Sequence, residues 1–132
     1  MRLDIVTPEA RVYSDEVDQV VLPGVEGEMG ILPMHVPLMT QIHPGELVVS
    51  KGGETLHLAV GEGFVEITQD HVAVLTEMAI EEKNIDEAAA EEAIRRAEAA
   101  MKDHSLGSEE SAAVQAAIAR SMAQLHVKRR RR

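Results

Sequence analysis

Apolar and polar residues alternate along the first part of the chain, up to about residue 78. Leu56, Leu58 and Val60 fall on one face of a strand, and the stretch from His71 to Thr76 repeats this period of two. Further short apolar runs occupy residues 3–6, 17–22, 38–42, 46–50 and 64–68. Period-two alternation is typical of half-buried β-strands, so this part of the chain is predicted to be a β domain.

Turn-forming residues separate these runs. Gly52-Gly53 fits a two-residue hairpin loop between the strands around Val48 and Leu58, and Gln69-Asp70 is predicted to turn the next hairpin. Further turn signals are Pro23-Gly24, Pro33, Pro37 and Pro44-Gly45. At least about eight strands at this spacing predict a compact antiparallel sandwich or barrel.

The pattern changes to a helical period at about Glu81, where alanine, glutamate and arginine begin to dominate. Asn84 or Asp86 can cap a first helix. Its expected apolar stripe is Ala90, Ile94, Ala97 and Met101. Its expected i,i+4 ion pairs are Glu91/Arg95, Glu92/Arg96 and Glu98/Lys102.

Gly107 interrupts the helical pattern, and Ser108 opens a second helix. The expected apolar stripe of this helix is Val114, Ile118, Met122 and Leu125. A short loop between two helices implies an antiparallel hairpin. Alanine buries little area but favours helix, so we expect strong helices joined by a weak interface that can open.

The charge is divided unevenly along the chain. There are 13 basic and 23 acidic residues, and the five residues 128–132 are all basic. The acidic remainder repels phosphate, and two aromatic residues cannot form a base-stacking platform, so nucleic-acid binding is disfavoured. The basic end is either a solvated, frayed terminus or a segment that docks on an acidic protein surface.

Several kinds of chemistry have little support in the sequence. Cysteine is absent, which excludes disulfides and thiol catalysis. The six histidines show no metal-ligand spacing, and no serine has a G-x-S-x-G context, so neither a metal site nor a catalytic residue is predicted. No apolar run approaches the ~20 residues that cross a bilayer, so direct membrane insertion is not expected.

The segment from Val21 to Leu38 combines glycine turns, a very short strand and three prolines. It resembles the motif G-x-E-G-E-x-G-I-x-P-x-H-x-P-L of the epsilon subunit of bacterial rotary (F-type) ATP synthases. Similar matches occur at residues 3–8, at Gly61-Glu62-Gly63-Phe64 and at Ile85-Asp86-Glu87-Ala88. The resemblance runs along the whole chain in the family's order.

The resemblance implies a sandwich of about ten strands in residues 1–82 and a helical hairpin with a basic tail in residues 83–132. In that family the sandwich sits on the gamma subunit and the c-ring as part of the rotor. The hairpin either folds down on the sandwich or extends into the alpha/beta head, where it inhibits ATP hydrolysis. The family member is a non-catalytic, peripheral subunit at the cytoplasmic face of the bacterial cell membrane.

The resemblance also suggests individual residues. Glu28 and His35 match motif positions near the rotor contact with gamma and the c-ring, although an ordinary polar loop is the alternative. The family's extended helix approaches an acidic motif on the catalytic beta subunits. The candidates for that inhibitory contact are Arg120, Lys128, Arg129, Arg130, Arg131 and Arg132.

Some members of the family bind ATP as a regulatory ligand through an I/L-D-x-x-R-A segment. Here Asp86 matches the segment but Ala89 replaces its arginine, so weak ATP binding or none is expected, and no other cofactor is implied. Arg96 resembles a second phosphate contact, and pairing with Glu92 explains it equally well. The competing hypotheses are a stand-alone binding module, such as an ATP sensor, and a small β-sandwich enzyme.

Overall fold

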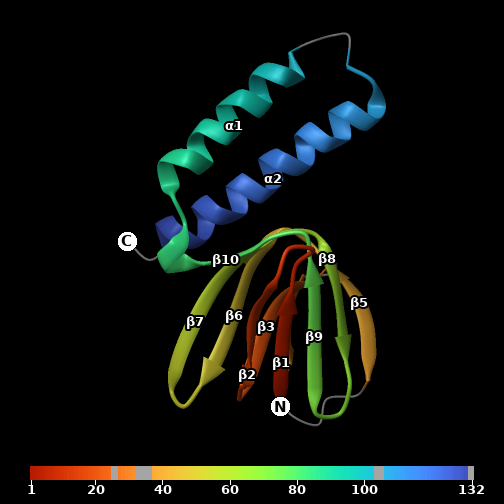
Figure 1. The fold of residues 1–132 in the computed structure, drawn as a ribbon, viewed down its shortest axis with the longest axis vertical. Helices are drawn as coiled ribbons and strands as arrows, with labels where there is room; N and C mark the ends of the chain where they lie inside the picture. Colours follow the sequence, from red (N-terminus) through yellow and green to blue (C-terminus); the bar gives the residue numbers. More distant parts are fainter. Residues whose placement is uncertain (25–26, 32–36, 103–105, 131–132) are drawn as a thin grey trace.

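The computed structural model describes residues 1–24, 27–31, 37–102 and 106–130. A ten-stranded β-sandwich is followed by a helical hairpin that stands at one end of it (Figure 1), so the expected fold class is confirmed. The strands are β1 (Arg2–Val6), β2 (Arg11–Glu16), β3 (Gln19–Gly24), β4 (Gly27–Ile31), β5 (Leu38–Ile42), β6 (Gly45–Lys51), β7 (Glu54–Val60), β8 (Gly63–Ile67), β9 (His71–Thr76) and β10 (Ala79–Glu81). The helices are the 3-10 turn η1 (Glu82–Asn84), α1 (Glu87–Met101) and α2 (Ser108–Arg130).

The strands follow the order β10-β7-β6-β3-β5-β8-β9-β1-β2, and β4 pairs with β3. Among these strands the pairing of β1 with β9 is parallel, and the other pairings are antiparallel. β3 pairs with β6 through residues 19–21 but with β5 only where Gly24 faces Ile42. The continuous set of strands can therefore fold over on itself and enclose a core between its two halves.

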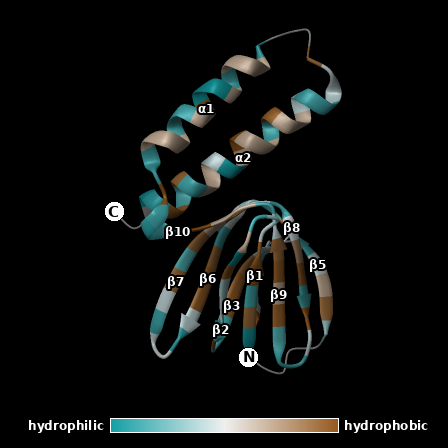
Figure 2. Ribbon diagram, in the orientation of Figure 1, coloured by the Kyte–Doolittle hydropathy of each residue, from teal (hydrophilic) through white to brown (hydrophobic). Residues whose placement is uncertain are grey.

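The core is formed by the inward residues of the strands. Leu3, Leu22, Leu47 and Val65 are among its fully buried members. Figure 2 shows the alternation of hydrophobic and hydrophilic positions along the strands that this burial requires. The residues of this large core all lie between Leu3 and Val74, so the sandwich buries it without help from the helices.

Two predicted hairpin turns are confirmed, at Gly52-Gly53 and at Gln69-Asp70. Pro23 and Gly24 are instead the last residues of β3 and still pair with β4, so the turn predicted there is wrong, and Pro33 lies outside the described residues. Gly52 and Gly53 have φ values of 58° and 82° and join Lys51 of β6 to Glu54 of β7, as a two-residue hairpin with positive φ requires. The β8–β9 turn is closed by the amide of Thr68, which donates to the carbonyl of His71 at 2.8 Å.

Two strands were not anticipated from the sequence. β2 reads Arg-Val-Tyr-Ser-Asp-Glu at one end of the strand order and has no fully buried residue. β10 has three residues, all half-buried, at the other end. A strand at a sheet edge buries little apolar surface, so the period-two pattern that reveals inner strands is missing from both.

α1 begins at one of the two predicted caps. The carboxylate of Asp86 accepts a hydrogen bond from the amide of Ala89 at 3.0 Å, while Asn84 belongs to η1. One predicted ion pair is wrong, because Glu91 bonds Arg129 of α2 and Arg95 instead bonds Glu92, three residues before it. The expected pair of Glu92 with Arg96 is present at 3.2 Å.

The predicted apolar stripes are only partly correct. Met101 and Met122 are exposed, Met122 to 57%, whereas Ala123, Leu125 and Val127 of α2 are buried. The difference arises because the last turns of α2 contact β6 and β7 as well as α1, so two faces of the helix are covered rather than one.

α2 rests on the outer face of the β6–β7 hairpin. Val127 is fully buried and packs with Ala59 of β7 and Ile85 of the segment before α1. On the same outer face Glu46 and His57 lie 3.0 Å apart between carboxylate oxygen and Nδ1. This contact surface for α2, which we call the β6–β7 seat, therefore combines a small apolar contact with polar groups.

We expect residues 1–82 to fold alone, because the core of the sandwich lies wholly within them. A chain ending at residue 82 should unfold cooperatively in urea. Leu47→Ala, which removes a fully buried side chain, should lower the free energy of unfolding by about 2–5 kcal/mol both in this fragment and in the full chain. A fragment with a non-cooperative transition would contradict this division of the chain.

Candidate functional site

Titratable side chains converge on the outer face of β1, β2 and β9. The Ser14 hydroxyl donates to Asp4 Oδ1 at 2.5 Å, and His71 Nε2 lies 2.7 Å from Asp4 Oδ2. Arg2 donates in turn to the Ser14 oxygen at 2.5 Å. The carboxylate stands between hydroxyl and imidazole, so the Ser14 hydroxyl donates to Asp4 and not to His71, unlike a serine activated by a histidine base.

This cluster has a structural consequence. The hydrogen bond from Ser14, and after it that from His71, holds the pKa of Asp4 below its usual range. Three strands, β1, β2 and β9, are tied together by the one carboxylate. The hypothesis of a small β-sandwich enzyme gains no support from this arrangement.

Metal binding has no candidate in the described part of the chain. Within residues 1–24, 27–31, 37–102 and 106–130 no group of three or more His, Cys, Asp or Glu side chains could hold a metal ion. Over the same ranges no helix has the length and apolar character needed to cross a membrane.

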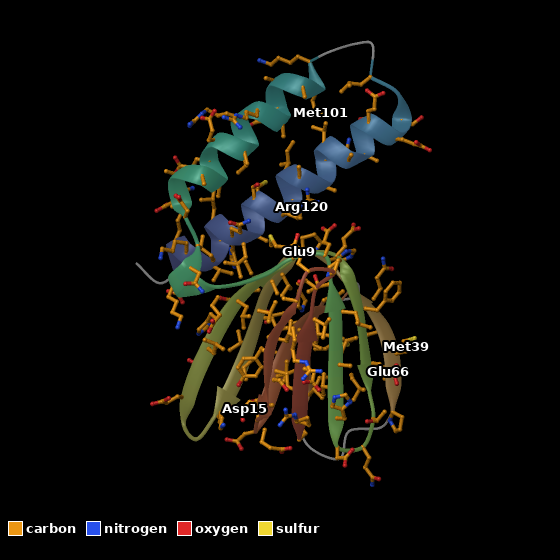
Figure 3. The ribbon with its side chains drawn as sticks, in the orientation of Figure 1. Glu9, Asp15, Met39, Glu66, Met101 and Arg120 are labelled. Carbon is orange, nitrogen blue, oxygen red and sulfur yellow. The ribbon has the colours of Figure 1, made fainter. Side chains whose placement is uncertain are left out.

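An exposed apolar patch lies on the outer face of β5, β8 and β9, and we call Met39, Phe64 and Leu75 the β5–β9 patch. These side chains are 66%, 55% and 52% exposed. Phe64 faces Leu75 across the β8–β9 pair, and Met39 faces Glu66 across the β5–β8 pair. Figure 3 shows Met39 and Glu66 at the side of the sandwich, away from the helices. Such a patch is typical of a protein–protein interface.

Sequence reasoning did not find this patch. Its signal is an apolar residue at an outward strand position, directly beside an inward one: Phe64 precedes the buried Val65, and Leu75 follows the buried Val74. In a continuous apolar run, the period of two does not show which residue points outward, so such residues are counted with the core.

The two predicted rotor-contact residues have different outcomes. Glu28 is exposed on β4, opposite Pro23 of β3, and it lines a groove of ≈ 540 Å³ between the sandwich and α2. Met122 and His126 of α2 line the same groove. His35 lies outside the described residues.

The basic candidates on α2 contact the chain itself. Arg120 lies 3.4 Å from a carboxylate oxygen of Glu77, and Lys128 Nζ donates to the carbonyl of Glu82 at 3.3 Å. Arg129 bonds Glu87 and Glu91 of α1. Arg130 is the last residue of α2, and Arg131 and Arg132 lie outside the described residues. Lys128 and Arg129 are thus part of a paired helix end rather than a frayed one.

The two possible ATP contacts are not brought together. Asp86 uses its carboxylate to cap α1, and Arg96 is exposed and paired with Glu92. The two residues are ten positions apart, which separates them by about 15 Å along the helix. The neighbours of Arg96 in a shallow groove between the helices are Ala93, Ala97, Ala113, Val114 and Ala117.

The comparison with known proteins now identifies the family. The family model described as ATP synthase, Delta/Epsilon chain, beta-sandwich domain matches residues 1–82, and the one described as the long alpha-helix domain matches residues 83–129. The ATP synthase epsilon chain of Dehalococcoides mccartyi strain BAV1 is 47% identical over the whole of this chain and 94% of its own length. The chain belongs to the ATP synthase epsilon chain family. The epsilon chain of Herpetosiphon aurantiacus is 42% identical over 132 residues, all of this chain and 96% of that protein.

Solved structures share the fold of the family. A chain in the OSCP/F1/c-ring structure of the Euglena gracilis mitochondrial ATP synthase gives a TM-score of 0.75 at 23% identity, covering 92% of this chain and 76% of that chain. One in the central stalk/c-ring structure of the Tetrahymena thermophila enzyme gives 0.62 at 12% identity, with 98% and 95% covered. At these identities the comparison shows the fold.

Asp4→Asn should destabilise the sandwich in a pH-dependent way. Because the folded-state pKa of Asp4 lies below its ordinary value of 3.8, the carboxylate stabilises the fold above that value, and this contribution is lost as the pH falls through the folded pKa. Urea unfolding should give a loss of about 1 kcal/mol at neutral pH that shrinks toward zero in acid. Asp70→Asn, in the exposed β8–β9 turn, is the control; an equal, pH-independent loss in both variants would contradict the assignment.

Proposed function

We propose that this protein is a non-catalytic rotor subunit of a proton-translocating ATP synthase, which couples gamma to the c-ring and restrains ATP hydrolysis through α2. The observation that carries the proposal is the match of both domains of the family, in order, along residues 1–129. As such a subunit it is peripheral at the cytoplasmic face of the bacterial membrane. No feature of the described residues favours the competing hypothesis of a stand-alone binding module over this one.

The β5–β9 patch is the surface for gamma. Its side chains are large and apolar, and the backbone that carries them is already ordered by strand pairing, so binding requires no ordering of the backbone. The patch lies on the side of the sandwich away from the β6–β7 seat of α2 (Figure 3), so gamma can stay bound whether the hairpin is closed or released. Glu28 and His35 remain the candidates for the rotor contact around the β4 loop.

The inhibitory role rests on how lightly α2 is held. In its seat Val127 packs with Ala59 and Ile85, and Ala123 and Leu125 are also buried. The ion pairs of α2, Arg120 with Glu77 and Arg129 with Glu87 of α1, are on partly exposed side chains. Partly exposed ion pairs each contribute about 1 kcal/mol or less. Regions with few buried contacts open at low free-energy cost, so α2 can leave the sandwich while the sandwich remains folded.

ATP is at most a weak ligand of this chain. Arg95 and Arg96 of α1 both pair with Glu92, and Arg129 of α2 pairs with Glu87 and Glu91, so these guanidinium groups are engaged within the chain. Release of α2 is therefore governed by the partner proteins rather than by a bound nucleotide.

Phe64→Glu and Leu75→Glu should each weaken binding of gamma by about tenfold or more, because each places a charge in the centre of an apolar interface. Both side chains are exposed, so the melting temperature should change little. Titration of purified gamma measures the affinity, and Thr55→Glu, at an exposed position near the start of β7, is the matched control. Equal affinity for gamma in the control and both patch variants would place the gamma contact elsewhere.

A chain ending at residue 106 should raise ATP hydrolysis by the reconstituted alpha, beta and gamma head relative to the full chain. The truncation removes α2 with its basic end, while the β5–β9 patch is retained. Co-purification with gamma checks that the subunit is still bound. Unchanged hydrolysis with normal binding would show that the hairpin is a structural element in this protein.

A further inference from the structure

The end of α2 is fastened to the start of α1 by charged contacts, which we call the clasp: Lys128 and Arg129 with Glu82, Glu87 and Glu91. Arg129 Nε donates to Glu87 at 2.7 Å, and its Nη2 donates to Glu91. Lys128 Nζ donates to the carbonyl of Glu82 at 3.3 Å. Figure 1 shows the end of α2 beside η1 and the first turn of α1.

In the clasp, Arg129 binds a pair of carboxylates with a defined spacing. Glu87 and Glu91 are four positions apart, so their carboxylates lie one turn apart on one face of α1. A single guanidinium, with its donors in a fixed fork, spans this pair of carboxylates. The same two glutamates hold the pKa of Arg129 above its usual value, with the Glu87 hydrogen bond as the larger cause.

The clasp lies at the surface, where its ion pairs can be broken. The side chains of Arg129 and Glu91 are 47% and 41% exposed, so solvent and salt screen their attraction. The buried residues of α1 are the small Ala90 and Ala97, and the groove between α1 and α2 remains open at Ile94, Ile118 and Met122. A loss of one or two ion pairs therefore changes the balance between closed and released α2.

We propose that Arg129 forms a carboxylate-binding surface with two alternative occupants: Glu87 and Glu91 of this chain when the hairpin is closed, and an acidic pair on a partner protein when α2 is released. Lys128, which donates to the backbone carbonyl of Glu82 in the closed hairpin, adds a second cation to this surface on release. The second occupant rests on the inhibitory role given under Proposed function. The two occupants exclude each other because Arg129 meets Glu87 and Glu91 only where the end of α2 lies beside α1, and release of α2 carries the guanidinium away from them.

This competition has a consequence for Glu91 of α1, which bonds Arg129 in the closed hairpin. Glu91 stabilises only the closed hairpin, so its removal favours release and strengthens every interaction of the freed basic end. Arg129 acts in both states, so its removal weakens both. The effect of removing Glu91 must therefore depend on the presence of Arg129, which a double-mutant cycle measures directly.

The first arm of the test uses the full chain alone. Glu91→Gln should speed hydrogen exchange of the amides in the last three turns of α2, and should tighten binding of a fluorescent ten-residue oligoglutamate, each by about two- to fivefold at low salt. The matched control is Glu92→Gln, which removes the same charge from the same helix but pairs with Arg95 and Arg96 of α1 itself. In an Arg129→Gln background, Glu91→Gln should have no further effect on either quantity.

The second arm uses the reconstituted head. Glu91→Gln should strengthen inhibition of ATP hydrolysis by about two- to fivefold, whereas Glu92→Gln leaves inhibition unchanged and Arg129→Gln abolishes the response to Glu91→Gln. If Glu91→Gln and Glu92→Gln behave alike in the free chain, or if the Glu91 effect persists without Arg129, the carboxylate-binding surface is overturned.

The two proposals fail separately. If the free chain behaves as expected but hydrolysis ignores both Glu91→Gln and the truncation at residue 106, the inhibitory role is wrong, and the surface and its closed-state occupant stand. If the truncation raises hydrolysis and Glu91→Gln does not change it, the inhibitory role stands and the exchange of occupants is wrong.

Discussion

The architecture depends on one constraint: the strands complete their hydrophobic core before the helices begin. The large core lies between Leu3 and Val74, and its inward positions are filled from all sides by strand residues. The helices supply no buried residue of this core and attach to outer surfaces of the sandwich: the β6–β7 seat, and the segment between β9 and β10, where Arg120 pairs with Glu77 and Gln124 bonds Met78. An element outside the core contributes little to the cooperative unit, so it can change position without unfolding the rest.

The attachment itself is a mixture that suits a reversible contact. Val127 supplies a small apolar anchor against Ala59 and Ile85, and charged pairs at Arg120 and Arg129 fix its direction. Apolar burial alone would hold α2 regardless of salt, and ion pairs alone would contribute little in water. Together they fix one closed position of α2 on the sandwich.

Much of the fold could be predicted from the sequence, for physical reasons visible in particular residues. Inner strands such as β9 bury every second residue, and Gly52-Gly53 can adopt the positive φ that its turn needs. The edge strands β2 and β10 were not predicted, because they bury little apolar surface and so lack the period-two pattern. The pairing of Arg129 with Glu87 was also not predicted, because pairing across a hairpin depends on how two helices cross and not on the spacing along one of them.

The functional surfaces were less accessible to sequence reasoning. Glu28 and the basic residues of α2 were reached through resemblance, and the structure shows that Arg120, Lys128 and Arg129 already have partners within the chain. The β5–β9 patch had no motif, because Phe64 and Leu75 differ from core residues only in the direction that the pleat gives them.

The parallel pairing of β1 with β9 has a consequence for how the chain comes off the ribosome. Arg2 lies opposite His71, so the first strand made finds this neighbour only after nearly all of the sandwich has been synthesised. Until then β1 has β2 as its antiparallel hairpin partner, and its other edge waits for β9. Contacts of such long sequence separation form late. β9 is thus the strand whose emergence closes the sandwich, while the sequence of α2 has still to be translated.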